Sequence, residues 1–88
     1  MKIEFDAAKD EANLAKHGVS RAAAAAIDLD GAVVFEDSRF EYGEPRFIAY
    51  APLKGRLQAM YFTIRGDVLR VIGLRKANQR ERKKYENS

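Results

Sequence analysis

Residues 57–75, LQAMYFTIRGDVLRVIGLR, decide the fold of this sequence. Both ends of the stretch are rich in β-branched and aromatic residues, which favour strands, and Arg65-Gly66-Asp67 stands between them as a turn. A connection this short joins antiparallel neighbours. The stretch therefore predicts a hairpin of two strands, at 57–64 and 68–75.

Two further strand-like segments precede this hairpin. Residues 46–51 and 32–36 have the same β-branched and aromatic composition. The turn segment at 52–55, Pro-Leu-Lys-Gly, connects the nearer one to the hairpin in the same antiparallel sense. The second half of the chain is therefore predicted to form a meander.

Helical patterns lie on both sides of these strands. Good helix formers fill 7–17 between a predicted N-cap at Asp6 and a stop at Gly18, and five consecutive alanines predict a short second helix at about 21–28. Ala8, Ala12 and Ala15 fall on one face of the first helix, and we expect this face to pack against the core. A final helix is predicted at about 79–86.

The final helix begins with a recognisable capping signal. Asn78 is a good N-cap, and Glu81 stands at the third helical position, where its carboxylate completes a capping box. The expected fold is thus α+β, with two N-terminal helices, a four-stranded mostly antiparallel sheet and a C-terminal helix. At 88 residues, we expect one domain spanning residues 1–88.

The residue inventory excludes several kinds of chemistry. The chain has no Cys and one His, so thiolate metal sites, disulfides and cysteine nucleophiles are ruled out, and no acidic loop offers a carboxylate site instead. The six glycines never form a phosphate-binding loop, and no Ser has a base nearby. We expect no metal, no cofactor and no serine nucleophile.

Charge is distributed unevenly along the chain. Residues 65–88 carry 8 Lys and Arg against 3 Asp and Glu, whereas residues 1–64 carry 8 against 10. A basic block indicates an anionic partner, either nucleic acid or an acidic protein surface, although solvated helices are also often Lys/Arg-rich. No apolar stretch approaches the ~20 residues that a membrane span needs, and we expect a cytoplasmic protein without membrane contact.

Several basic residues lie on and beside the last predicted hairpin: Arg65, Arg70, Arg75, Lys76 and Arg80. Arg70 and Arg75 are five apart, so in a regular strand they would point to opposite faces. A β-bulge at Gly73 would bring them to one face.

Arginine suits phosphate because its planar, permanently charged fork makes paired hydrogen bonds. Cleavage of RNA by its own 2′-hydroxyl needs a base, a charge clamp on phosphorus and an acid, and these can all be side chains. The alternative is that the arginines only solubilise a sheet edge. Composition alone leaves both interpretations open.

Two further side chains are candidate proton donors or acceptors. His17 is the chain's one imidazole, a side chain that commonly serves as general acid or base, but beside Gly18 its ring can instead cap the first helix. Tyr85 lies close to the basic helix, whereas Tyr50 and Tyr61, on strands, are expected to pack.

Two segments of the chain resemble the BrnT toxin family. IEFDAAKDEANLAKHGVS at 3–20 is similar to the family's opening, with the pattern K-x-x-x-N-x-x-K-H-G at 9–18, and VLRVIGLRKANQRERKKYEN at 68–87 is similar to its ending. The chain departs from the usual pattern in having Phe5 for Trp, Gly73-Leu74 for Ser-Ala and Asn78 for Thr.

The resemblance implies a RelE-like ribonuclease toxin of a type II toxin-antitoxin system that inhibits translation. It implies neutralisation by a ribbon-helix-helix antitoxin of the BrnA type, with operator DNA bound only through that antitoxin. The matching motif residues are Lys9, Asn13, Lys16, His17, Gly18, Arg65, Arg70, Arg75, Glu81 and Tyr85.

These arguments together predict a metal-independent endoribonuclease. The expected catalytic residues are Arg65, Arg75, Arg80, His17 and Tyr85, the RNA-binding residues are Arg70, Lys76, Lys83 and Lys84, and the antitoxin-contact residues are Lys9, Asn13 and Lys16. We expect the antitoxin to cover either the basic surface or the motif face of the first helix. The rival hypothesis is a non-catalytic module whose basic end holds an acidic protein or nucleic acid.

Overall fold

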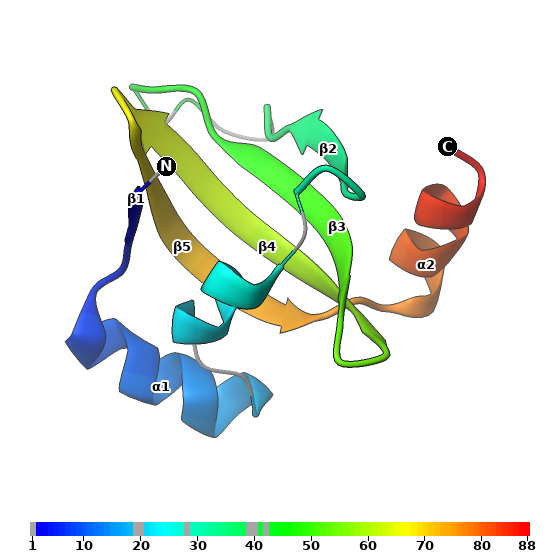
Figure 1. The fold of residues 1–88 in the computed structure, drawn as a ribbon, viewed down its shortest axis with the longest axis horizontal. Coiled ribbons are helices and arrows are strands. Elements are labelled where there is room, and N and C mark those ends of the chain that lie inside the picture. Colours follow the sequence, from blue (N-terminus) through cyan, green and yellow to red (C-terminus); the bar gives the residue numbers. More distant parts are fainter. Residues whose placement is uncertain (1, 19–20, 28, 39–40, 42) are drawn as a thin grey trace.

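A twisted sheet forms the centre of the molecule, with strand order β1-β5-β4-β3-β2 (Figure 1). The computed structural model describes residues 2–18, 21–27, 29–38, 41 and 43–88. The strands are β1 (Lys2–Glu4), β2 (Val33–Glu36), β3 (Phe47–Leu53), β4 (Arg56–Arg65) and β5 (Val68–Lys76).

The predicted meander is present. The pairs β2–β3, β3–β4 and β4–β5 are all antiparallel. A two-residue loop joins β3 to β4, and both of its residues, Lys54 and Gly55, adopt left-handed backbone angles with φ of 51° and 78°. Positive φ at both loop residues matches the right-handed twist of the flanking strands and is typical of a tight hairpin.

The expected four-stranded, mostly antiparallel sheet is wrong, because a fifth strand makes the sheet mixed. β1 lies parallel to β5, with Ile3 opposite Leu69. Three residues are too few to show the alternation of a strand, and a parallel neighbour that is distant in the chain leaves no turn signal.

The α-helices are α1 (Ala7–His17) and α2 (Gln79–Glu86), as predicted, but the expected second N-terminal α-helix is wrong. Its place is taken by η1 (Arg21–Ala26), a 3₁₀ helix, and residue 28 lies outside the described residues. Ala24 and Ile27 are both buried, and a 3₁₀ turn brings side chains three apart onto one line. Core packing at this spacing therefore overrides the α-helical preference of alanine.

The core lies on the face of the sheet that η1 covers. Its buried side chains include Met60, Phe62, Leu69, Val71 and Leu74. η1 and α1 both lie on this side in Figure 1, while α2 lies away from them at the other end of the sheet.

The helix α1 does not contact the sheet through the alanine face that the sequence predicted. Ala12 and Ala15 are exposed, whereas Asn13 is buried, and its Nδ2 donates to the carbonyl of Leu74 at 2.8 Å. A polar side chain thus attaches the helix to β5. None of the helices in the described part of the chain is long and apolar enough to cross a membrane.

The second face of the sheet carries a different set of side chains. Phe35 and Tyr50 share this face, with ring centroids 5.9 Å apart, and Tyr61 and Arg75 lie on it farther along the sheet. α2 packs here, because Lys84 lies over the Phe35 ring. The face opposite the core is therefore polar, aromatic and bordered by the basic helix.

Candidate functional site

A cavity of about 350 Å³ lies between the start of α2 and the second face of the sheet. It combines side chains from β2, β3, β4 and β5 with those of α2. The polar residues that line it include Tyr50, Tyr61, Arg75, Arg80, Glu81 and Lys84.

Arg75 and Glu81 form the fixed part of this site. Arg75 Nη1 donates to Glu81 Oε1 at 2.7 Å and Nη2 donates to Oε2 at 2.8 Å, which is a two-pronged ion pair. Nη1 also donates to the carbonyl of Lys76 at 3.3 Å, and Nη2 to the hydroxyl of Tyr61 at 2.8 Å. Four of the five guanidinium hydrogens are thereby engaged within the protein.

The surroundings keep this pair ionised. Hydrogen bonding to Glu81 raises the pKa of Arg75 above its ordinary value, and burial opposes the rise. For Glu81, burial raises the pKa, but the hydrogen bonds from Arg75 and from the backbone of Asn78 outweigh it, so the net pKa is lowered. The pair is therefore a stable structural element at neutral pH.

The capping box predicted for α2 is confirmed and is part of the same network. Glu81 N donates to Asn78 Oδ1 at 2.9 Å, and Asn78 N donates to Glu81 Oε1 at 2.9 Å. Glu81 thus holds the first turn of α2 with the same carboxylate that binds Arg75. The start of the helix and the end of β5 are fixed relative to each other.

Two tyrosine hydroxyls lie beside the ion pair. Tyr61 accepts a hydrogen bond from Arg75, which orients its hydroxyl oxygen toward the guanidinium. Burial, and then the charge of Glu81, raise the pKa of Tyr50, so its hydroxyl stays protonated at neutral pH. The hydroxyl of Tyr50 is hydrogen-bonded to Glu81 and therefore belongs to the same network as the ion pair.

Two cations from α2 complete the lining. Arg80 is exposed at the wall of the cavity. The ammonium of Lys84 lies 3.9 Å from the centroid of the Phe35 ring, a cation–π contact that holds this charge at the cavity edge. The cavity therefore presents the charges of Arg80 and Lys84 beside the hydroxyl of Tyr61 and the carboxylate of Glu36.

The structure places two of the predicted arginines elsewhere. Arg65 lies at the β4–β5 turn, at the far end of the hairpin from Arg75, and its Nη2 is 2.9 Å from Glu44 Oε1. Arg70 forms an ion pair with Glu4 of β1. Neither is among the described residues that line the cavity.

The predicted bulge beside Gly73 is confirmed. Tyr61 pairs with Gly73, but Phe62 pairs with Val71, so β5 has one extra residue there. The bulge puts Arg70 and Arg75 on the same face, opposite the core. Their separate carboxylate partners nonetheless keep them apart.

The two acid–base candidates of the sequence lie outside the cavity. His17 ends α1, which packs on β5 and η1. The hydroxyl of Tyr85 points to the carbonyl of Gly31 at 3.5 Å, and its side chain lines a separate hollow together with Arg82. Lys76 and Lys83 are exposed and are not among the described residues that line the cavity.

The motif residues of α1 differ in their surroundings. Asn13 is buried and bonded to β5, so its side chain has a structural role. Lys9 and Lys16 are exposed. Their proposed contact with an antitoxin stays a prediction.

Sequence reasoning set Tyr50 and Tyr61 aside as packing residues, and it gave Glu81 a capping role and a place in the family motif but no contact with Arg75. The available signal was the period of the strands: Tyr50 alternates with the small core residues Ala49 and Ala51, and so faces away from the core. No local sequence pattern indicates the pairing of Arg75 with Glu81, because one lies at the end of β5 and the other at the start of α2.

The family model described as "Ribonuclease toxin, BrnT, of type II toxin-antitoxin system" matches residues 5–81 of the chain. The matched part ends at Glu81, so it contains Arg80 and both members of the Arg75–Glu81 ion pair. Lys84 and Tyr85 lie beyond it. The comparison with curated proteins finds no match.

Proposed function

The chain belongs to the BrnT family of ribonuclease toxins of type II toxin-antitoxin systems, and we propose that it cleaves RNA in the cavity beneath α2 without a metal ion. Family membership implies an RNA substrate and an antitoxin partner. The place of cleavage and the independence from metal are our own proposals.

One observation carries the assignment of the cavity. The cavity gathers the cations Arg80 and Lys84 beside the hydroxyl of Tyr61, a set of groups suited to phosphate. Among the described residues, no three His, Asp or Glu side chains gather as metal ligands would. Side chains would therefore supply the charge that stabilises the reacting phosphate.

The roles we propose follow from the hydrogen bonds. RNA is cut when its 2′-hydroxyl gives its proton to solvent water and attacks the adjacent phosphorus, while the bond to the 5′-oxygen breaks and that oxygen gains a proton. Arg80 and Lys84 stabilise the added negative charge, because fixed cations aimed at developing charge lower the barrier. Tyr61 donates the proton to the leaving oxygen.

Arg75 acts through its neighbours in this proposal. Its donors are engaged by Glu81, Tyr61 and the backbone, so it holds the hydroxyl of Tyr61 and the start of α2 in place. We keep Arg65, His17 and Tyr85 as proposed contacts for more distant parts of the RNA. Lys83, Lys76 and Arg70 extend the same basic surface.

We further propose that the partner is a ribbon-helix-helix antitoxin of the BrnA type, through which alone the pair binds operator DNA. Cleavage of RNA would then inhibit translation when the antitoxin is absent. The rival proposal is a non-catalytic module that only holds a polyanion. The engaged state of Arg75 is the observation that favours this rival, since its guanidinium is taken up within the protein and is not available to stabilise a reacting phosphate, while the exposed cations of α2 could still hold a polyanion.

One assay separates the two proposals. Purified, antitoxin-free protein is incubated with single-stranded RNA in EDTA, and fragments are followed over time with enzyme in excess. We expect cleavage to persist in EDTA and to leave a cyclic 2′,3′-phosphate on the upstream fragment. Intact RNA would favour the binding module, and cleavage that returns only with Mg²⁺ would overturn the metal-free mechanism.

A further inference from the structure

Phe35 brings an aromatic ring to the wall of the cavity on the strand that lies farthest from Arg75. β2 is the last strand of the sheet, so no strand of the described structure covers its outer side. On the inner side the ring meets that of Tyr50, with 5.9 Å between the ring centroids and an angle of 54° between the planes. Phe35 is half-buried, so part of its ring is accessible from the cavity.

The ammonium of Lys84 occupies a face of this ring, 3.9 Å from its centroid. Lys84 is exposed and reaches the ring on a flexible four-carbon stem. A cation–π contact at an exposed site is weaker than the stacking of a nucleic-acid base on an aromatic ring. A base can therefore replace the ammonium, which then turns to a phosphate of the same strand.

The position of Phe35 fits a nucleotide whose phosphate lies in the cavity. Phe35 pairs with Ile48 and Ile48 pairs with Tyr61, so the three residues lie in one row across the sheet. Neighbouring strands are about 4.8 Å apart, which places Phe35 roughly 10 Å from Tyr61 along this row. A phosphate beside Tyr61 and a base on Phe35 can therefore belong to the same short stretch of RNA.

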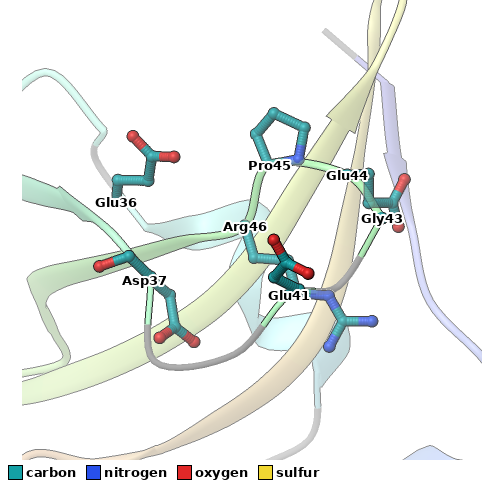
Figure 2. Close-up of a pocket in the computed structure, with 8 residues that line it drawn as sticks. Glu36, Asp37, Glu41, Gly43, Glu44, Pro45 and Arg46 are labelled. Atoms are coloured by element: carbon teal, nitrogen blue, oxygen red, sulfur yellow. The ribbon is translucent and has the colours of Figure 1, made fainter.

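An acidic pocket of about 550 Å³ adjoins the cavity next to Phe35, and the two share Glu36 and Ser38. Figure 2 shows the carboxylates around this pocket, which belong to Glu36, Asp37, Glu41 and Glu44, with Arg46 among them. Carboxylates repel phosphate groups, whereas a base carries no charge. The β2 end of the cavity is therefore suited to a base, and the α2 end to the phosphates.

We propose that Phe35 is a stacking platform for a base of single-stranded RNA, and that the base takes the place of the Lys84 ammonium on the ring. Aromatic side chains bind unpaired bases in this way, and they accept all four because every base has a π-face. The inference deepens the proposed function and rests on it for the RNA ligand. It gives Phe35 a part in holding the RNA, separate from the charge stabilisation and proton transfer proposed above.

The first test separates the base from the phosphates, with the full chain and two probes. One probe is a short single-stranded RNA with 2′-O-methyl groups, which cannot be cut because its 2′-oxygens are blocked, and the other is an abasic oligomer with the same number of phosphates. We expect the wild type to bind the base-bearing probe about tenfold more tightly than the abasic one. Phe35→Leu should lose this difference, and Phe35→Tyr, which restores a ring, should keep it.

Val34→Ala is the matched control, because Val34 precedes Phe35 on β2 and faces the opposite side of the sheet. It should preserve the difference between the two probes, and thermal unfolding shows that each variant is folded. If Phe35→Leu weakens the binding of both probes equally, Phe35 has a structural role and the inference is overturned. A wild type that binds both probes alike overturns it as well.

Fluorescence reports the stacking directly. The chain contains no Trp, so Phe35→Trp introduces its only indole. Binding of the 2′-O-methyl probe should quench the fluorescence of this indole, whereas the abasic probe should leave it unchanged. Phe5→Trp is the control, because Phe5 packs against the core and is not among the described residues that line the cavity. Equal quenching in both variants, or quenching in neither, contradicts the platform.

These measurements do not depend on cleavage. If the binding of bases depends on Phe35 but RNA stays intact with the protein in excess, the platform is supported and the ribonuclease proposal is refuted. If RNA is cut and the preference for the base-bearing probe does not depend on Phe35, the ribonuclease proposal stands and the platform is refuted.

Discussion

Glu81 shows how one side chain can serve two elements. Its carboxylate accepts from the backbone of Asn78 at the start of α2 and from both terminal nitrogens of Arg75 at the end of β5. Local sequence predicts the first contact, since Asn and Glu three apart form a capping box. The second depends on where β5 ends in space, which no local pattern encodes.

The pKa of Glu81 gives a prediction for stability against pH. Because its net pKa is lowered in the folded protein, its ionised form stabilises the fold above the ordinary glutamate pKa, and this contribution is lost as pH falls through the lowered value. Glu81→Gln should lower the free energy of unfolding by about 2 kcal/mol at pH 7. Between pH 6 and about pH 3 its stability should fall less steeply than that of the wild type.

Urea unfolding at several pH values measures this difference. Glu86→Gln, at the exposed end of the same helix, is the control and should follow the wild type. If Glu81→Gln and Glu86→Gln have the same stability at pH 7, the carboxylate does not hold the helix to the sheet.

At the scale of elements, the sequence predicts those with a clear period or cap and misses those set by distant contacts. The helices at 7–17 and 79–86 and the β4–β5 hairpin follow from caps and turns, and they are confirmed. β1 and η1 were missed or misassigned, because a parallel partner and a core spacing of three residues are tertiary features.

The buried face of α1 gives a prediction at this scale. Ala12 and Ala15, which were expected to pack against the core, are exposed, and Asn13 bonds to the Leu74 carbonyl instead. Asn13→Ala should therefore lower the free energy of unfolding by about 1.5 kcal/mol, since it leaves that carbonyl without this amide donor. Lys16→Ala, exposed on the same helix, should change it by less than about 0.5 kcal/mol.

Thermal or urea unfolding checks this pair. Once corrected for the unfolded fraction, antitoxin binding by Asn13→Ala should equal that of the wild type. Unchanged stability together with weaker antitoxin binding would instead make Asn13 a contact residue, as the family motif suggested.

For the whole molecule, the sheet separates two surfaces of different chemistry. The core face presents η1, α1 and an apolar groove, and the opposite face presents the ion pair, the tyrosines and the cations of α2. The sequence predicted the basic end and its arginines. It did not show that ion pairs hold Arg65, Arg70 and Arg75 in three separate places, because their partners Glu44, Glu4 and Glu81 are distant in the chain or on another element.

The central claim, that RNA is cut in the cavity beneath α2, is tested most directly by two substitutions on that helix. Arg80 lines the cavity, whereas Arg82 lines a separate hollow, and both are exposed, so neither replacement by Ala should disturb the core. Single-turnover cleavage of one RNA is measured for both variants in EDTA. We predict a loss on the order of 10²-fold for Arg80→Ala, as for a donor aimed at developing charge, and a change of less than about threefold for Arg82→Ala. Equal losses would mean that the helix acts only as a diffuse positive charge, and the cavity would not be the place of cleavage.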